Sequence, residues 1–158
     1  MNRRIGLALL AVGLLLFCSE VRMNADEKEV ALPKLPTGAG KVDKDAPKTF
    51  TATKSGLKYR VLRKGTGDKP TARDTVEVNY EGWVDGGKVF DSSYNRGKSI
   101  SFPLDGVIAG WTEGMQLVGE GGMIELEIPG KLAYGDRPPP GIAPGATLHF
   151  VVELLDVQ

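Results

Sequence analysis

Residues 76–90 read VEVNYEGWVDGGKVF, and the architecture of the chain follows from this stretch. Apolar and polar residues alternate from Val76 to Glu81, which is typical of a β-strand that buries one face. The tripeptide Asp-Gly-Gly at 85–87 then interrupts the pattern before a second apolar segment at 88–90. An Asp-Gly pair between two such segments indicates a tight hairpin. The stretch therefore predicts two antiparallel strands.

The same alternation recurs on both sides of this hairpin. Segments 57–61, 124–128 and 148–154 each place an apolar residue at every second position. Glycine makes up 21 of the 158 residues, which favours many turns and argues against a helical bundle. Several strands joined by glycine-rich turns predict one antiparallel sheet.

A single segment has helical spacing. Ile108, Trp111 and Met115 fall on one face of a helix, and Asp105 lies upstream as a candidate cap. Gly110 and Gly114 would weaken this helix unless their missing side chains let it lie close against a sheet. We therefore predict an α+β fold, in which a curved antiparallel β-sheet wraps around one short α-helix.

Composition excludes several classes of function. Basic and acidic residues number 20 each, so no net positive charge attracts nucleic acid. The chain has one histidine and one cysteine, too few for a zinc site, an iron–sulfur cluster or a disulfide framework. No cofactor-binding motif is found. We expect no metal, no cofactor and no nucleic-acid partner.

The first 25 residues are predicted to be a targeting segment. Two arginines precede an uncharged apolar run at 5–17, which is too short to span a bilayer and suits a secretory signal. Cleavage of this signal would release an exported protein. Two alternatives remain open: an uncleaved signal that tethers the protein to the membrane, or a lipid anchor on Cys18, which ends the apolar run.

Residues 26–52 differ in composition from the rest of the chain. Lysine, aspartate, proline and glycine dominate, and Pro33, Pro36 and Pro47 interrupt any helix. We expect a flexible tether here, followed by a compact domain at 53–158.

Three polar side chains on the predicted strands invite a catalytic interpretation. His149 alternates with the apolar face of the last strand and has no serine or cysteine partner, so we expect it to be structural. Glu125 and Glu127 lie on one face of a strand like a pair of catalytic carboxylates. Their regular alternation with apolar residues instead predicts a solvated outer face.

Several aromatic residues accompany a single acid and a proline-rich loop in the second half of the chain. Such rings most often just fill a small core, and Asp91 beside two serines could be a turn cap. The pieces are Tyr80, Phe90-Asp91-Ser92-Ser93, Phe102, Trp111, Ala133-Tyr134-Gly135 and the loop at 138–144.

The order and spacing of these motifs resemble one family, the FKBP-type peptidyl-prolyl cis–trans isomerases. The opening segment looks most like exported bacterial members, which implies a periplasmic location. The resemblance covers Ser55 to Leu155. Its motifs are Ser55-Gly56-Leu57-Lys58-Tyr59, Val78-Asn79-Tyr80-Glu81-Gly82, Phe90-Asp91-Ser92-Ser93, Val107-Ile108-Ala109-Gly110-Trp111, Ala133-Tyr134-Gly135, Ala146-Thr147-Leu148 and Val152-Glu153-Leu154-Leu155.

The resemblance implies an FKBP-like fold and a role for each matching residue. Trp111 would form the floor of an apolar pocket for the proline ring. The Ile108 backbone N–H and the Tyr134 hydroxyl would donate hydrogen bonds to substrate carbonyls. Asp91 would lie at the rim, oriented by Tyr80 and Arg96. The walls would be Tyr80, Phe90, Val107, Ile108 and Phe150, with Ile142 and Ala143 facing the pocket and Ile100 standing where many relatives carry an aromatic ring.

The resemblance also implies the substrates. These would be proline-containing polypeptides, unfolded or partly folded, and macrolides would be candidate inhibitors. Two other functions stay open at this point. A domain that keeps the fold could bind proline-containing segments without turnover, or could serve a purely structural purpose.

Overall fold

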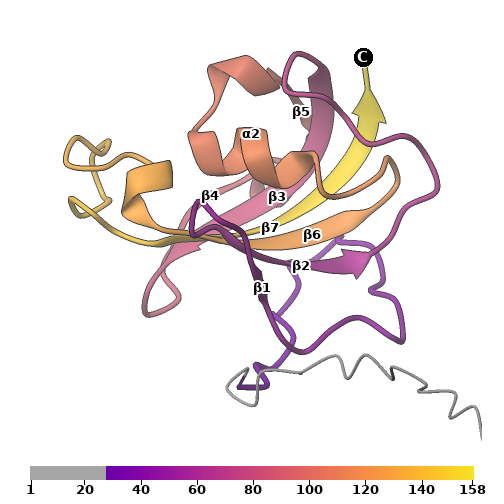
Figure 1. The fold of residues 1–158 in the computed structure, drawn as a ribbon, viewed down its shortest axis with the longest axis horizontal. Coiled ribbons are helices and arrows are strands. Elements are labelled where there is room, and N and C mark those ends of the chain that lie inside the picture. The colour runs from indigo at the N-terminus through magenta and orange to yellow at the C-terminus, as the bar shows by residue number, and fades with distance from the viewer. Residues whose placement is uncertain (1–27) are drawn as a thin grey trace, which may run out of the picture.

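The computed structural model describes residues 28–158, and a seven-stranded antiparallel sheet is its main element (Figure 1). The strand order is β1-β2-β6-β7-β3-β4, with β5 also paired to β3. The strands are β1 (Thr51–Ala52), β2 (Lys58–Arg63), β3 (Thr75–Val84), β4 (Val89–Ser92), β5 (Ile100–Pro103), β6 (Met123–Ile128) and β7 (Leu148–Val157).

The predicted hairpin at 76–90 is confirmed as β3, a turn and β4. The Val84 N–H donates to the Lys88 carbonyl at 3.1 Å, and the Gly87 N–H donates to the Val84 carbonyl at 2.9 Å. Gly86 and Gly87 have φ values of +87° and +83°, a region that glycine enters without steric cost. Strand β3 also pairs with β5 and β7, so it is an interior strand, while β4 ends the strand order at one edge of the sheet.

The predicted helix is confirmed as α2 (Ala109–Met115), which crosses the concave face of the curved sheet (Figure 1). Its two glycines are required by close packing. A Cβ atom on Gly110 would collide with Ile128, and one on Gly114 would lie 2.7 Å from Leu126. The predicted cap is wrong: Asp105 lies within the short 3₁₀ helix η1 (Leu104–Gly106), and Ile108 caps α2 without a side-chain hydrogen bond.

The structure contains a one-turn helix that the sequence analysis did not predict, α1 (Ser93–Arg96). The Ser92 hydroxyl accepts a hydrogen bond from the Asn95 N–H at 3.3 Å, and Gly97 ends the turn with φ at +65°. A second 3₁₀ helix, η2 (Gly130–Leu132), precedes the proline-rich loop. The main core fills the space between α2 and the sheet, and contains Val78, Met115, Leu126 and Val152.

Residues 28–50, which we call the N-terminal strap, pack against the sheet through a second apolar cluster. Leu35, Ala39 and Val42 contact the buried side chains of Leu62, Met123 and Val151. The Asp43 N–H also donates to the Leu62 carbonyl at 2.8 Å. This arrangement differs from the flexible tether expected here, because composition does not reveal contacts that the sheet supplies.

Arg60 on β2 is the main polar anchor of the strap. Its Nη1 and Nη2 atoms donate to the carbonyls of Val30 and Ala31, both at 2.7 Å, and Nη1 also reaches the Lys48 carbonyl at 3.2 Å. Its Nε atom donates to Glu125 at 2.6 Å. Arg60 and Glu125 are therefore buried, and the solvated face predicted for Glu125 is wrong because the strap covers it. Glu127 stays partly exposed beside Lys58.

The predicted export signal and Cys18 lie outside the described residues. Within residues 28–158, no helix combines the length and apolar character needed to cross a bilayer.

Candidate active site

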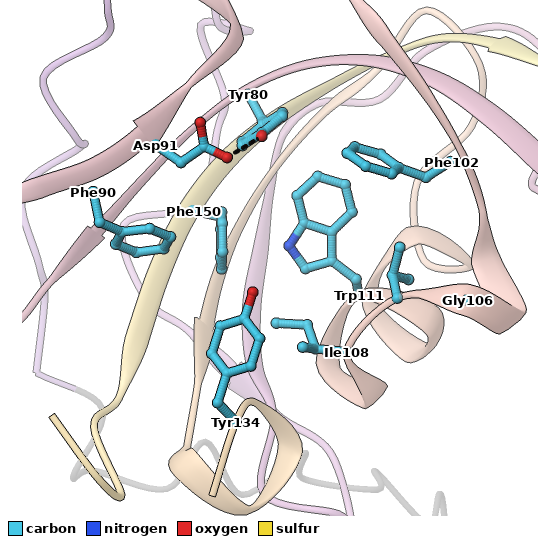
Figure 2. A pocket seen from close by; sticks show the side chains of 10 residues that line it. Tyr80, Phe90, Asp91, Phe102, Gly106, Ile108, Trp111, Tyr134 and Phe150 are labelled. Atoms are coloured by element: carbon cyan, nitrogen blue, oxygen red, sulfur yellow. Dashed lines mark hydrogen bonds between the residues drawn. The ribbon is translucent and has the colours of Figure 1, made fainter. Parts of the chain in front are cut away.

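A hollow of about 310 Å³ opens beside α2 on the concave side of the sheet (Figure 2). Strands β3, β4, β5 and β7 supply aromatic walls, while the start of α2 and the segment after η2 supply the remaining sides. The lining residues are Tyr80, Phe90, Asp91, Phe102, Gly106, Val107, Ile108, Trp111, Tyr134 and Phe150.

Trp111 on α2 is the centre of this hollow and is only 4% exposed. Its ring packs edge-on against Tyr80, Phe102 and Phe150, with centroid distances of 5.3, 5.7 and 5.4 Å. Edge-to-face pairs are the arrangement that aromatic rings prefer. The indole is thus held rigidly by three strands, and one of its sides faces the opening (Figure 2).

Gly82 on β3 makes room for the neighbouring wall. A Cβ atom there would lie 2.8 Å from the Phe90 ring and closer still to Phe150. Its absence lets these two rings meet edge-on, with centroids 5.6 Å apart. A continuous apolar wall results.

Asp91 is the one acid that lines the hollow. It accepts hydrogen bonds from the Tyr80 hydroxyl and the Arg96 guanidinium, and Arg96 Nη2 also donates to the Tyr80 oxygen at 3.1 Å. Burial alone would raise the pKa of Asp91, but the hydrogen bonds from Tyr80 and Arg96 outweigh it and lower this pKa. Burial, with the hydrogen bond to Asp91, raises the pKa of Tyr80 to about 12. At neutral pH the pair is a carboxylate and a neutral phenol.

Two hydrogen-bond donors stand unused at the mouth of the hollow. Tyr134 is 41% exposed, and its hydroxyl points toward the space between Ile108 and Phe150 (Figure 2). The Ile108 N–H lies just before the first turn of α2, and among residues 28–158 it donates to no other group. Both donors are free to bind a carbonyl oxygen.

The structure gathers most of the predicted site residues in this hollow, namely Tyr80, Phe90, Asp91, Val107, Ile108, Trp111, Tyr134 and Phe150. Arg96 lies outside it and contacts Asp91. Ile100 and Ile142 do not line it: Ile100 is 36% exposed on β5, and Ile142 packs partly buried against the core.

The prediction of walls missed Phe102 and Gly106. Phe102 lies two residues after Ile100, so both fall on the same face of a strand. Alternation alone therefore does not tell which of the two lines the hollow. Phe102 is one of the aromatic residues that accompany Asp91 in the sequence, and its pairing opposite Val76 places it in the sheet. Gly106 has no side chain that could have signalled a site. Across the described residues, no three acidic, histidine or cysteine side chains gather as a metal site requires.

Comparisons with known proteins agree with this geometry. The family described as FKBP-type peptidyl-prolyl cis-trans isomerase matches residues 67–155. The isomerase FkpA of Escherichia coli is 52% identical over 111 residues, which are 70% of this chain and 41% of that protein. The isomerase Mip of Coxiella burnetii is 47% identical over 105 residues, covering 66% of this chain and 46% of that protein. The chain thus spans less than half of either relative.

Solved structures show the same similarity. The crystal structure of FkpA from Escherichia coli superimposes with a TM-score of 0.68 at 52% identity, and covers 69% of this chain and 51% of that one. A peptidyl-prolyl cis-trans isomerase from Pseudomonas syringae gives a TM-score of 0.64 at 37% identity, covering 69% and 80%. The α+β fold predicted from the sequence is confirmed.

Proposed function

The chain belongs to the FKBP-type peptidyl-prolyl cis–trans isomerase family, and we propose that it accelerates rotation about Xaa-Pro bonds in exported polypeptides. The observation that carries the proposal is the aromatic hollow with two unused donors at its mouth. It provides an apolar seat for a proline ring and polar partners for the carbonyls beside it. No covalent step, metal or titrating base is needed.

The barrier to be lowered arises from amide resonance. A planar amide resists rotation by about 18–20 kcal/mol because resonance separates charge between its oxygen and nitrogen. The twisted transition state has lost much of this charge separation. A hollow walled by Trp111, Phe90 and Phe150 excludes water, and so withdraws the solvation that favours the planar form.

Hydrogen bonds and charge at the rim would add selectivity for the twisted state. The Ile108 N–H and the Tyr134 hydroxyl would hold the flanking carbonyls while the imide bond turns. Asp91 would face the carbonyl carbon, which becomes more electrophilic as resonance is lost. Its ionised state is maintained by Tyr80 and Arg96.

A protease-coupled assay on a Xaa-Pro peptide tests this function directly. We expect wild-type protein to exceed the uncatalysed rate, and Tyr134→Phe to lower kcat/KM by about tenfold, since one hydrogen bond of about 1–1.5 kcal/mol is lost in the transition state. Tyr59→Phe is the matched control, because the Tyr59 ring packs against the core away from the hollow.

Two other outcomes would contradict the proposal. Wild-type rates equal to the uncatalysed rate, with peptide still bound, would indicate a binding protein without turnover. Unchanged turnover and binding in Tyr134→Phe and Asp91→Ala would indicate that the hollow has no role in catalysis.

The pH dependence of kcat/KM should be flat. Asp91 has a lowered pKa and Tyr80 a pKa of about 12, so neither changes charge between about pH 6 and pH 9. At acid pH the stability of the folded protein should fall instead. Ionised Asp91 stabilises the fold fully above its unfolded pKa, and this contribution is lost as the pH falls through its lower folded pKa. A rate profile measured from pH 5 to 9 checks this expectation, and a step near pH 7 would show that another group titrates in catalysis.

Export completes the proposal, on the basis of the sequence of residues 1–25. We propose that these residues direct the protein to the periplasm, and that Cys18 is either removed with the signal or carries a lipid. Incorporation of labelled palmitate that depends on Cys18 distinguishes these two fates. Macrolides are proposed as competitive ligands of the same hollow.

A further inference from the structure

A buried carboxylate connects the N-terminal strap with the helix that carries Arg96. Glu153 on β7 is 5% exposed and accepts hydrogen bonds from three separate parts of the chain. The Gly40 N–H and Arg63 Nη2 each donate to Oε1 at 2.9 Å, and the Tyr94 hydroxyl donates to Oε2 at 2.6 Å. The strap, β2 and α1 therefore meet at one side chain.

The strap approaches Glu153 as closely as glycine allows. A Cβ atom on Gly40 would lie 2.5 Å from the Glu153 carboxylate and would also collide with the Arg63 guanidinium. Gly38, with φ at +92°, passes beside the Tyr94 ring. A larger residue at position 40 would force either the strap or the ends of the Glu153 and Arg63 side chains to shift, and either movement would disturb the network.

Tyr94 lies on α1 between two residues that serve the proposed active site. The Ser93 hydroxyl accepts a hydrogen bond from the Tyr80 N–H at 2.9 Å, and Arg96 contacts both Asp91 and the Tyr80 hydroxyl. A helix of four residues has little stability of its own, so its anchors set its orientation. Burial and the hydrogen bond to Glu153 raise the pKa of Tyr94, which keeps this phenol a donor.

We propose that Tyr94 and Glu153 are positioning residues for isomerisation: their hydrogen bond holds α1 so that Arg96 meets Asp91, and the strap stabilises this arrangement through Gly40. The inference rests on the proposed isomerase function. The strap lies outside the family match, which begins at residue 67. The proposal gives this segment a part in orienting Asp91.

The Tyr94→Phe variant tests this proposal, because it keeps the ring and removes only the hydroxyl. We expect kcat to fall by about tenfold while KM stays within about twofold, since the apolar hollow is untouched and only the orientation of charge changes. The pKa of Asp91, measured by NMR titration of its carboxyl carbon, should rise toward its ordinary value of about 3.9. Tyr59→Phe, the matched control, should change neither quantity.

A double-mutant cycle shows whether Tyr94 acts through Arg96. In an Arg96→Gln background, Tyr94→Phe should lower kcat by less than about twofold, because the group that it positions is already gone. Two results would overturn the proposal. One is a double variant whose loss of kcat equals the product of the two single losses. The other is an Asp91 titration that Tyr94→Phe leaves unchanged. If the wild-type protein lacked isomerase activity, only the proposed function would fail, since the Asp91 titration still decides whether Tyr94 positions Arg96.

The Gly40→Ala variant tests the contribution of the strap. Its Cβ atom would force the strap, or the ends of the Glu153 and Arg63 side chains, to shift. Either movement loosens the contact between strap and network, so Asp91 should titrate at a higher pH than in the wild-type protein. An Asp91 titration identical to that of the wild-type protein would show that the strap has no part in the arrangement.

Discussion

Replacing Trp111 by alanine is expected to lower kcat/KM for a Xaa-Pro peptide by about one to two orders of magnitude. The indole is the surface on which the proline ring would rest, and burying an apolar group of that size contributes roughly 1.5–3 kcal/mol. Each 1.4 kcal/mol or so corresponds to a factor of ten in rate. The change also removes the ring that Tyr80, Phe102 and Phe150 contact, so the remaining walls lose their fixed spacing.

The same substitution destabilises the fold, and the experiment has to separate the two effects. Truncating a buried tryptophan costs about 3–5 kcal/mol. The assay is therefore run at a temperature well below the midpoint of thermal unfolding of the variant, and circular dichroism measures the folded fraction. Trp83→Ala is the matched control. Trp83, the other tryptophan of the chain, stacks on the His149 ring and packs against the second apolar cluster, which the strap also contacts. It should lose stability and keep its kcat/KM. Equal losses of activity in both variants would contradict the role of Trp111.

The parts of the fold that the sequence predicted are those with a local cause. Alternation with period two identified β3, β6 and β7, because a strand that buries one face must repeat in this way. Spacing at three and four residues identified α2, and its glycines indicated the close packing against Ile128 and Leu126 that the structure contains. Strand β5 and helix α1 have only four residues each, too few for a period to be recognised.

The parts that the sequence did not predict depend on contacts between distant segments. The strap lacks any periodic pattern, and its placement follows from the Arg60 guanidinium, which binds carbonyls of Val30, Ala31 and Lys48. Backbone carbonyls leave no trace in composition. Consequently Glu125, the partner of Arg60, was expected on a solvated face. The site residues likewise came from the family resemblance, because spacing alone does not distinguish a ring that lines a hollow from a ring that fills a core.

Replacing Arg60 by methionine is expected to reduce the free energy of unfolding by about 3–5 kcal/mol, the usual cost of leaving one partner of a buried ion pair alone. The Arg60 side chain is 0% exposed and that of Glu125 is 7% exposed. The substitution would leave the Glu125 carboxylate and the Val30 and Ala31 carbonyls without this donor, while the Lys48 carbonyl would keep the Val30 N–H at 2.8 Å. Arg60 also stacks over the Phe50 ring at 4.6 Å, and this contact with the end of the strap would be lost too.

Lys58→Met is the matched control for this change. Lys58 pairs with Glu127 at 2.7 Å in the same two strands, but its side chain is 51% exposed, so its loss should cost less than about 1 kcal/mol. Urea unfolding followed by tryptophan fluorescence measures both variants. An Arg60→Met loss no greater than that of Lys58→Met would show that the strap and the buried pair add little to stability.

The pH dependence of the Arg60→Met variant gives an independent test of the cause. Burial raises the pKa of Glu125 even though Arg60 acts in the opposite direction, so removing Arg60 must raise this pKa further. A carboxyl group whose folded pKa exceeds its unfolded pKa destabilises the fold as the pH rises through the interval between them, and protonation relieves the cost. The stability gap between Arg60→Met and the wild-type protein should therefore narrow as the pH falls from 7 toward 5. Adding Glu125→Leu should recover part of the loss at pH 7 and remove this pH dependence, while the strap carbonyls stay without a donor. A gap that is constant with pH would assign the loss to the strap contacts and not to the buried carboxylate.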